Sequence, residues 1–307
     1  MFQAFEIGTF IIWTRLLFVV IGIWMATEFF LRVANSAHLS LQHFKEHGWW
    51  YISAFLLGGR GFSVISEYNV YFREPLRFLI FWDGSFSILG GAIGIGIVLY
   101  FVTRGHRTTF LQWLDALFPA ATLGMVFEWL GAFFSGHNYG RPTDMFWGVT
   151  YDAMNVRYSV PIHPIQLYYA LFFFFLTFVL LIIRKRSKRV GAETLVGIIC
   201  ASAATFVFEY FRGDFAIPVF ATKIDFVLLL ALFVSLGVFA ALEQKISKQS
   251  GFLYELALAI IALGYLFSRP WLDLETYELR FSQLLAVLSL LATVVYVVDQ
   301  RRRYPYL

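Results

Sequence analysis

Five charged residues inside predicted apolar helices have the types and the depth needed to bind a phosphate group. Arg15, Arg60 and Glu128 each lie about six residues, or about 9 Å, inside one end of their predicted helix. The topology predicted from the basic clusters places that end on the outer side of the membrane. Glu209 and Arg212 lie at the outer end of a further helix, three positions apart and therefore on one helical face. Three arginines against two carboxylates leave a positive surplus, which suits an anionic lipid headgroup.

Two interpretations of these charges compete. In the first interpretation, the long charged side chains extend to the lipid headgroups. For Arg212 alone, this interpretation is as good as a role in a shared cavity. Isolated charges at the depth of Arg15, Arg60 and Glu128 are costly in lipid. A shared polar cavity that opens to the outer leaflet explains these three residues together, so we expect a lipid-sized recess there.

Two histidines on the same predicted side could transfer protons. His163 stands at the start of a predicted helix, and His137 lies in the polar segment before it. Each histidine also has a structural interpretation, His163 within a polar cluster at a helix start and His137 as an ordinary loop residue.

Two glycine pairs flank a loop between predicted helices. One helix carries Gly58-Gly59-Arg60, the loop ends in Trp82-Asp83-Gly84, and the next helix opens with Gly90-Gly91. Paired glycines let backbones, or a ligand, approach closely. The pairs therefore indicate either helix packing or a substrate recess.

The composition identifies the class of protein that must position these residues. The chain has 307 residues, of which 59% are hydrophobic and 14% charged, and its mean hydropathy is +0.69. Apolar stretches recur at about 20 residues, the length that crosses a bilayer as a helix. This pattern excludes a soluble domain. The net charge of +4 does not indicate nucleic-acid binding, because the basic residues form short clusters between apolar stretches.

The apolar pattern predicts an all-α polytopic membrane protein with about nine spans. The predicted spans are residues 9–31, 48–66, 87–103, 110–134, 164–184, 192–211, 224–242, 252–268 and 282–299. Basic clusters follow the third, fifth, seventh and ninth spans, at residues 104–107, 184–189, 245–248 and 301–303. Because Lys and Arg gather on the cytoplasmic side, we expect the N-terminus outside and the C-terminus in the cytoplasm.

Two features divide the chain into parts. The segment 135–163 is rich in turn residues and aromatics, so we expect it to fold as a small cap on the outer face. The last two spans carry no polar residue at mid-depth and are expected to form a structural hairpin. We therefore predict one membrane domain over residues 1–248, which includes the cap, and an additional transmembrane hairpin over 249–307.

Several short motifs, taken in order, resemble those of the prolipoprotein diacylglyceryl transferases of bacterial plasma membranes. The matching motifs are Leu57-Gly58-Gly59-Arg60, Trp82-Asp83-Gly84, Gly90-Gly91-Ala92-Ile93-Gly94, Leu130-Gly131 with Gly140-Arg141, His163-Pro164-Ile165-Gln166-Leu167-Tyr168 and Glu209-Tyr210-Phe211-Arg212. They occur in the family's order and close to its spacing, over roughly residues 7 to 245. The resemblance implies a seven-span transferase-like core with the N-terminus outside, to which the hairpin is added.

The resemblance also implies a transfer reaction at the outer leaflet of the bacterial plasma (inner) membrane. The diacylglyceryl group of phosphatidylglycerol would move to the lipobox cysteine thiol of a preprolipoprotein, and glycerol phosphate would leave. Such chemistry needs a route to the thiolate, since a free cysteine has a pKa of about 8.5, and cations to hold the phosphate. The expected partners are a membrane phospholipid, with phosphatidylglycerol as the expected species, and preprolipoprotein signal peptides. No cofactor, metal ion or nucleic acid is expected.

The charges and the resemblance together give a set of candidate site residues. The candidates for catalysis are His163, His137 and Glu209. The candidates for substrate binding are Arg15, Arg60, Asp83, Gly90, Gly91, Glu128, Gly140, Arg141, Gln166 and Arg212.

The chain departs from the family pattern at several of its functional positions. The family has a histidine directly before the second Gly-Gly pair, where this chain has Leu89, which cannot transfer a proton. The family's signature arginine, asparagine and glutamate, a second arginine and a tyrosine correspond here to Trp129, Ala132, His137, Thr205 and Arg15.

Three functions are therefore in competition. The first is a divergent diacylglyceryl transferase, in which Arg15, Arg60 and Arg212 hold the lipid phosphate. The second is a catalytically altered or inactive relative that binds anionic lipid or a membrane partner through the same recess. The third is a transferase on this scaffold that acts on a different lipid group or acceptor. The resemblance favours an enzyme, whereas the missing histidine favours altered or absent activity.

Overall fold

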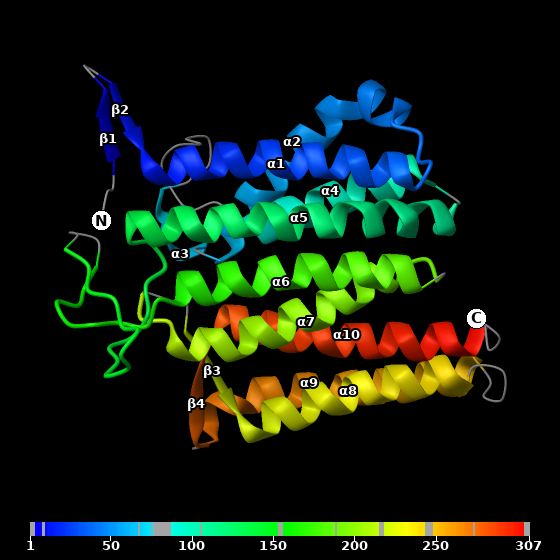
Figure 1. Ribbon diagram of the computed structural model, residues 1–307. Coiled ribbons are helices and arrows are strands. Elements are labelled where there is room, and N and C mark those ends of the chain that lie inside the picture. Colours follow the sequence, from blue (N-terminus) through cyan, green and yellow to red (C-terminus); the bar gives the residue numbers. More distant parts are fainter. Residues whose placement is uncertain are drawn as a thin grey trace. The chain divides into compact units, whose positions relative to one another are not determined.

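The computed structural model (Figure 1) shows a chain made mostly of helices. The described residues are 4–7, 10–66, 68–74, 76, 87–104, 106–152, 156–187, 189–214, 218–242, 248–272 and 274–303. In chain order the elements are β1 (Ala4–Ile7), β2 (Phe10–Trp13), α1 (Thr14–Ser36), α2 (Gln42–Ser66), α3 (Tyr68–Arg73), α4 (Ile88–Val102), α5 (Arg107–Ser135), α6 (Ile165–Arg186), α7 (Ala192–Phe208), the 3₁₀ turn η2 (Glu209–Phe211), β3 (Pro218–Thr222), α8 (Lys223–Leu242), α9 (Lys248–Ser268), the 3₁₀ turn η3 (Arg269–Trp271), β4 (Thr276–Arg280) and α10 (Phe281–Arg303).

The helices agree with the predicted membrane class. Each predicted span coincides with a helix over most of its described length. Within the described residues, five helical stretches are long and apolar enough to cross a membrane: Thr14–Ser36, Thr108–Ser135, Ile165–Arg186, Ala192–Phe211 and Phe281–Val298. The prediction that the first helix starts near residue 9 was wrong, because β2 pairs with β1 as an antiparallel hairpin before α1 begins. The chain is a multi-pass helical membrane protein.

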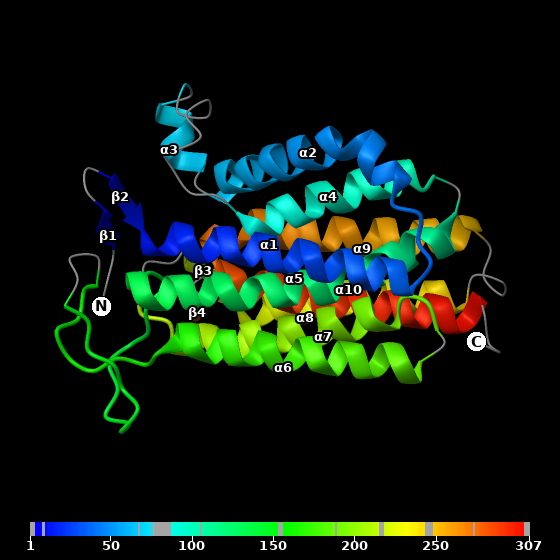
Figure 2. The same ribbon diagram turned by 45° about the horizontal axis from the view of Figure 1, so that its top comes forward.

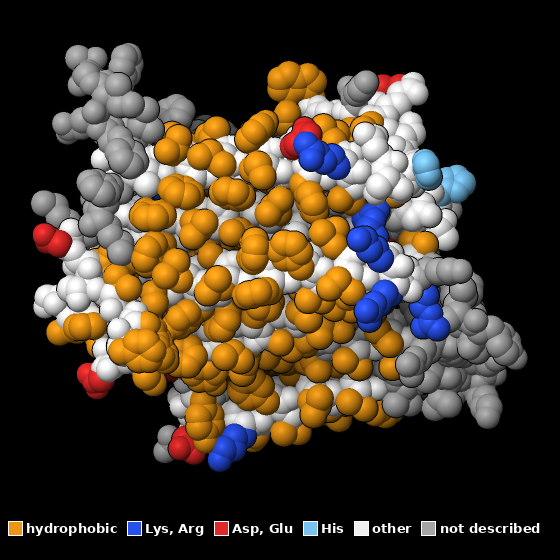
Figure 3. Space-filling view, viewed as in Figure 1, with side chains coloured by type: hydrophobic (Ala, Val, Ile, Leu, Met, Phe, Trp, Pro, Cys, Tyr) orange, Lys and Arg blue, Asp and Glu red, His pale blue; other side chains and the backbone are white. Residues whose placement is uncertain are grey.

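The helices expose apolar side chains, as lipid contact requires. Helix α6 buries Tyr169, Phe173 and Leu176 but exposes Phe175 and Phe178. Hydrophobic side chains cover most of the helical surface on the face in Figure 3, and most of the basic side chains on that face lie toward one end of the helices. Exposed apolar patches of this extent are unfavourable in water and favourable in lipid.

The structure divides into two compact units, which are described separately. Unit 1 comprises residues 1–22, 125–180 and 195–307, and unit 2 comprises residues 23–124 and 181–194.

In unit 2, helices α2 and α4 run side by side (Figures 1 and 2). Glycines permit this close approach, since a Cβ on Gly58 would collide with the backbone of Gly90. A Cβ on Gly94 would likewise collide with the carbonyl of Ala54. Small residues that bring backbones together are the usual means of packing helices in lipid, where no hydrophobic driving force acts between them.

A buried carboxylate caps the N-terminus of α7, within unit 2. Asp115, from α5, accepts hydrogen bonds from the backbone N–H of Gly191 at 2.5 Å and of Thr194 at 2.9 Å. These N–H groups precede or open α7 and have no partner within the helix. Arg184 lies beside them and contacts Glu193 at 3.4 Å. This end of unit 2 is therefore held together by polar contacts.

In unit 1, a short antiparallel ladder joins the segments that flank α8 and α9. Strand β3 pairs with β4 in a register that runs from Pro218 opposite Arg280 to Thr222 opposite Thr276. Helix α8 packs against α9 and α10. The ladder brings the start of α10 to the end of α7, although long stretches of chain separate them.

The segment between α5 and α6 has its own small core within unit 1. Tyr139, Tyr151 and Ile162 are buried against one another. The Tyr151 hydroxyl donates to the carbonyl of Phe133 at 3.1 Å, and burial raises the pKa of this tyrosine. Backbone bridges pair Ile162 with Val149 and with Pro142. Residues 136–152 and 156–164 therefore form an ordered cap over the end of α5.

Candidate functional site

The cap is joined to the end of α7 at Gly140. Gly140 forms an antiparallel bridge with Arg212, and Gly213 N–H donates to the Tyr139 carbonyl at 2.9 Å. On its other side, Gly140 lies against His163, and a Cβ at position 140 would collide with the His163 carbonyl. Only glycine fits between these two backbones. The cap thus brings Gly140, His163 and Arg212 together, as the shared candidate site requires.

Arg141 presents an exposed guanidinium beside this junction. Its backbone N–H donates to the Phe211 carbonyl at 2.7 Å, and its carbonyl accepts from His163 N–H at 2.9 Å. The Arg141 Nε atom donates to the Arg212 carbonyl at 3.1 Å. Among the described residues, the Nη groups of Arg141 have no partner, so they are available to an anion.

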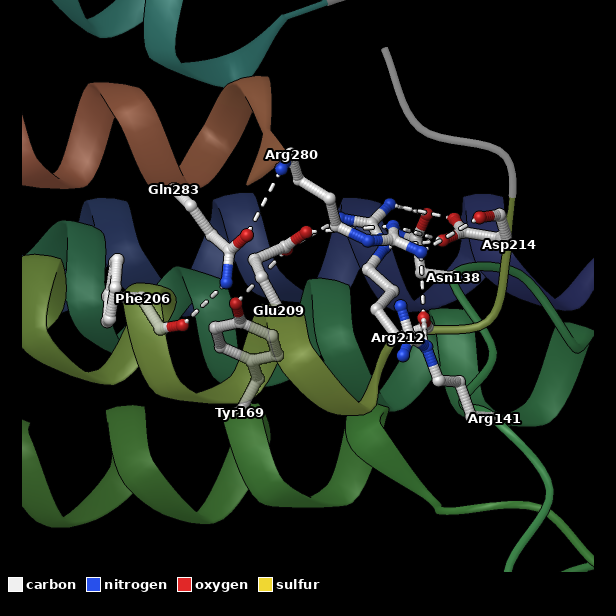
Figure 4. A network of polar contacts seen from close by, with 9 residues as sticks. All are labelled: Asn138, Arg141, Tyr169, Phe206, Glu209, Arg212, Asp214, Arg280 and Gln283. Carbon is white, nitrogen blue, oxygen red and sulfur yellow. Dashed lines mark hydrogen bonds and ion pairs between the residues drawn. The ribbon is translucent and has the colours of Figure 1, made fainter. Parts of the chain in front are cut away.

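Next to the junction lies a polar cluster that we call the Glu209 network (Figure 4). Its side chains are those of Asn138, Arg141, Tyr169, Glu209, Arg212, Asp214, Arg280 and Gln283. Arg212 is central, because its Nε and Nη2 atoms donate to the two Asp214 oxygens, each at 2.8 Å, and its Nη1 donates to Glu209 at 2.9 Å. The Asn138 amide oxygen accepts from Arg212 at 3.0 Å, and the Tyr169 hydroxyl donates to Glu209 at 3.3 Å. The predicted proximity of Glu209 and Arg212 is confirmed.

A second guanidinium completes the Glu209 network from a distant part of the chain. Arg280 Nη1 lies 3.1 Å from Asp214 and 3.7 Å from Glu209. Arg280 Nη2 donates to the carbonyls of Arg212 at 2.7 Å and Asp214 at 3.0 Å. Two guanidiniums therefore face two carboxylates, of which Glu209 is only 3% exposed. Buried charges are tolerated only when they are paired in this way.

His163 is oriented by two aromatic neighbours. Its Nδ1 atom lies 3.1 Å from the Tyr168 hydroxyl, which accepts a hydrogen bond from Trp147 Nε1 at 2.7 Å. The imidazole also meets the Phe211 ring at a centroid distance of 5.0 Å. Burial lowers the pKa of His163, so the ring is neutral at pH 7.

His137 lies at the start of the cap and contacts Ser135 through Nδ1 at 3.0 Å. Its carbonyl accepts a hydrogen bond from the buried Gln166 amide at 2.8 Å. Burial lowers the pKa of His137, and the positive charge of Arg15 lowers it further. Gln166 therefore has a clear role in holding the cap to the start of α6.

Arg15 and Glu128 form an ion pair between α1 and α5. Arg15 Nη2 lies 2.5 Å from Glu128 Oε1, and its Nε lies 3.2 Å from the same oxygen. The Arg15 side chain is 40% exposed and the Glu128 side chain 13%. The helices meet closely at Gly131, where a Cβ would press against Phe18. Glu128 therefore neutralises much of the positive charge that Arg15 could offer to an anion.

The remaining predicted residues belong to unit 2 or lie outside the described residues. Arg60 is buried, with its guanidinium 5.4 Å from the centre of the Tyr71 ring. Gly90 and Gly91 are buried against α2, where both glycines make helix-packing contacts. Leu89, at the start of α4, is 47% exposed. Asp83 lies outside the described residues.

Unit 1 therefore brings together most of the candidate site. The predicted residues within it are Arg15, Glu128, His137, Gly140, Arg141, His163, Gln166, Glu209 and Arg212. Five residues of the Glu209 network were not predicted: Asn138, Tyr169, Asp214, Arg280 and Gln283. Arg280 carried a usable signal, because it is a charged residue at the predicted outer end of a span, as Arg212 is. Among the described residues, no group of His, Cys, Asp or Glu side chains could hold a metal ion.

Position 129 holds a large aromatic residue in the same region of unit 1. The Trp129 ring stacks on Tyr169 with centroids 4.1 Å apart and planes 7° from parallel. Both side chains are buried, and Trp129 Nε1 has no hydrogen-bond partner among the described residues. A stacked aromatic pair thus occupies the place where the resemblance leads one to expect a cation.

Comparison with known proteins identifies the family. The family model for prolipoprotein diacylglyceryl transferase matches residues 3–298, which include the C-terminal helices. Three similar proteins are phosphatidylglycerol–prolipoprotein diacylglyceryl transferases. The protein from Wolbachia pipientis is 30% identical over 213 residues, which cover 68% of this chain and 80% of the relative. The protein from Polynucleobacter necessarius is 29% identical over 222 residues, which cover 68% of this chain and 81% of the relative.

The third relative, from Idiomarina loihiensis, is 29% identical over 175 residues, which cover 56% of this chain and 65% of the relative. This chain thus spans a little under two thirds of that relative's length. The motif order, the helical membrane fold and the family match lead to one conclusion: the chain belongs to the prolipoprotein diacylglyceryl transferase family.

Proposed function

We propose that this protein transfers the diacylglyceryl group of phosphatidylglycerol to the cysteine thiol of a preprolipoprotein. Family membership supports the proposal. The observation that carries it is the junction at Gly140, where backbone contacts hold His163, Arg141 and Arg212 beside one another. In the reaction, a carbon–sulfur bond forms and the bond from that carbon to the phosphate oxygen breaks. The thiol proton passes to a base, and glycerol phosphate leaves.

His163 is the base in this proposal. Its neutral ring at pH 7 has one nitrogen free to accept a proton. The proposal assigns the tautomer in which Nδ1–H donates to the Tyr168 hydroxyl, 3.1 Å away, which leaves the Nε2 lone pair for the thiol. His137 is the alternative base, but the positive charge of Arg15 makes its ring a weaker one. Glu209, already engaged with Arg212, acts by fixing that arginine rather than by moving a proton.

Arg141 and Arg15 are the proposed phosphate ligands. The Arg141 guanidinium is exposed, and Arg15 keeps 40% of its side-chain surface exposed despite its pairing with Glu128. A guanidinium binds phosphate oxygens through two parallel N–H groups and stabilises the charge that develops on the leaving group. Arg212 supports Arg141 through its backbone carbonyl. Arg60, Asp83, Gly90 and Gly91 stay proposed substrate contacts on the basis of the family motifs alone.

The proposal places the reaction at the outer leaflet of the bacterial inner membrane, with the N-terminus outside. The proposed partners are phosphatidylglycerol and the signal peptides of preprolipoproteins, as the names of the relatives indicate for those proteins. The division at residue 248, between a transferase-like domain and a terminal hairpin, is likewise a proposal.

Complementation in bacteria tests this function. Cells depleted of their own diacylglyceryl transferase would express the wild-type chain, His163→Gln, or His106→Gln as a control on an exposed histidine outside unit 1. We expect diacylglyceryl-modified lipoprotein with the wild type and with His106→Gln, and a loss of about 100-fold or more with His163→Gln. If the wild type reaches the membrane in normal amounts and no lipoprotein is modified, the proposed function is wrong.

A further inference from the structure

The C-terminal hairpin contributes a charged side chain to the Glu209 network. We infer that Arg280 is a positioning residue that holds Arg212 and Glu209 in place for an anionic headgroup, so that the hairpin is part of the functional site. This inference rests on the proposed function. Figure 4 shows the Arg280 side chain, at the end of β4 and directly before α10, reaching toward Glu209, Arg212 and Asp214.

The charges of the Glu209 network require Arg280. The side chains of Arg212, Arg280, Glu209 and Asp214 are 21%, 13%, 3% and 16% exposed. Without Arg280, two carboxylates in a poorly solvated site would share one guanidinium. An uncompensated buried charge is strongly unfavourable. The two carboxylates would then compete for Arg212, and Arg212 would lose its fixed orientation.

The Arg212 carbonyl links Arg280 to Arg141, whose guanidinium is exposed. This oxygen accepts one hydrogen bond from Arg280 Nη2 at 2.7 Å and another from Arg141 Nε at 3.1 Å. The two guanidiniums therefore hold the same peptide group. Arg280 fixes the acceptor that orients Arg141, whose Nη groups have no partner in the described part of the chain.

Several further contacts hold Arg280 in position. Its backbone N–H donates to Gln283 Oε1 at 3.1 Å, and Gln283 Nε2 donates to the Phe206 carbonyl on α7 at 3.1 Å. Gln283 is buried. Arg280 also ends the β3–β4 ladder, opposite Pro218. A side chain with this many constraints is pre-organised, whereas a surface arginine that merely extends to the headgroups has no such support.

The hairpin also provides a matched control. Arg269 lies in η3, pairs with Asp225 at 3.0 Å and donates to the carbonyl of Phe220. It thus ties the hairpin to β3 and α8 and, among the described residues, makes no contact with the Glu209 network. If Arg280 served only to attach the hairpin, Arg269→Gln and Arg280→Gln would have similar effects.

Thr205 offers a site for rescue. It lies one helical turn before Glu209 on α7, and its side chain interacts with the same Tyr169 hydroxyl that donates to Glu209. An arginine at position 205 would place a guanidinium beside Glu209 from α7 instead of from β4. Thr205→Arg can therefore restore the missing positive charge without restoring any tie to the hairpin.

The experiment compares full-length wild type, Arg269→Gln, Arg280→Gln and Arg280→Gln/Thr205→Arg in nanodiscs. Three quantities are measured: the transfer rate to a lipobox peptide, the affinity for phosphatidylglycerol relative to phosphatidylcholine, and the unfolding temperature. We expect Arg280→Gln to lower the transfer rate about 10- to 100-fold and the preference for phosphatidylglycerol about 10-fold. Arg269→Gln should keep both, and Thr205→Arg should restore most of the loss.

The outcomes separate the inference from the proposed function. A wild type that binds phosphatidylglycerol but transfers nothing contradicts the proposed function, while the lipid preference of Arg280→Gln still tests the inference. Loss of preference at an unchanged unfolding temperature supports the inference, and rescue by Thr205→Arg identifies Glu209 as the partner. Equal effects of Arg280→Gln and Arg269→Gln would overturn it. So would a lowered unfolding temperature with no rescue, because Arg280 would then be merely structural.

Discussion

Gly140 and His163 lie so close together that no side chain fits between them. A Cβ at position 140 would meet both the carbonyl and the Cβ of His163. Gly140 also bridges to Arg212 on its other side. This one glycine therefore sets the separation between the proposed base and the end of α7.

Replacing Gly140 with alanine should force these segments apart. We expect Gly140→Ala to destabilise the protein by about 1–3 kcal/mol, as overpacking does, and to lower the transfer rate more than the loss of stability explains. Thermal unfolding in detergent and the transfer rate of the folded fraction check this. Gly264→Ala in α9 is the control, since a Cβ there meets nothing within 4 Å. Equal behaviour of the two variants would contradict the crowding at Gly140.

Acidification should inactivate the enzyme only below the ordinary titration range of histidine. Burial lowers the pKa of His163 from its usual value near 6.5, so the neutral base persists at pH 6.5 and is lost as the pH falls further. The acidic limb of the rate profile should therefore have its midpoint below pH 6.5. A midpoint above 6.5 in the wild type, or an unchanged limb in His163→Gln, would show that another group is the base.

The folded state should also become less stable as the pH falls. His137 and His163 both have a folded-state pKa below the unfolded value, so the unfolded chain binds protons more readily. Their contribution is fully present above pH 6.5 and is lost as the pH falls through the folded-state values. Unfolding temperatures measured from pH 7.5 to pH 5 should fall with pH, and less steeply in the His137→Gln/His163→Gln variant. An identical slope in that variant would assign the effect to other groups.

Releasing Arg15 from Glu128 should strengthen anionic lipid binding. The pair is partly exposed, so its worth is discounted to roughly 0.2–1 kcal/mol. Glu128→Gln should therefore raise the affinity for phosphatidylglycerol by up to about 5-fold. Equilibrium binding to nanodiscs of phosphatidylglycerol and phosphatidylcholine measures this. The gain should disappear in Arg15→Gln/Glu128→Gln, and a gain that persists there would mean that Arg15 is not the cation involved.

The same substitution at two glycines of α4 should destabilise the protein at one position and be tolerated at the other. Gly94 lies against the Ala54 carbonyl, whereas a Cβ at Gly96 meets nothing within 4 Å. Gly94→Leu should separate α2 from α4 and destabilise the protein by about 1–3 kcal/mol or more. Gly96→Leu should be tolerated, because leucine there extends into open space. Unfolding in detergent and the folded yield from membranes distinguish the two outcomes.

Most of the fold could be predicted from apolar length alone, because a membrane helix carries its own signature. The two small β-sheets, β1–β2 and β3–β4, could not. Residues 10–13 are as apolar as the helix that follows, so the first span was placed too early. The β3–β4 ladder joins segments whose pairing depends on how α8 and α9 pack, and no local pattern specifies that packing.

The candidate site was predictable where charges are close in sequence or carried by family motifs. Glu209 and Arg212 stand three positions apart, which fixes their pairing. Arg280 could not be assigned to them, because only the folded hairpin brings it to Glu209 and Asp214. Gly90 shows a different limit. The Gly90-Gly91 pair in the sequence was compatible with either helix packing or a substrate recess. The packing contact between Gly90 and Gly58 becomes visible only in the folded structure.

The position of Arg280 has a consequence for how the protein is made. Glu209 and Asp214 emerge from the ribosome well before Arg280, because α8 and α9 lie between them in the chain. During synthesis, a nascent chain holds two carboxylates for one guanidinium until the end of β4 has been made. The charge-balanced site can therefore form only after α8 and α9 have been synthesised, and a product truncated before β4 lacks it.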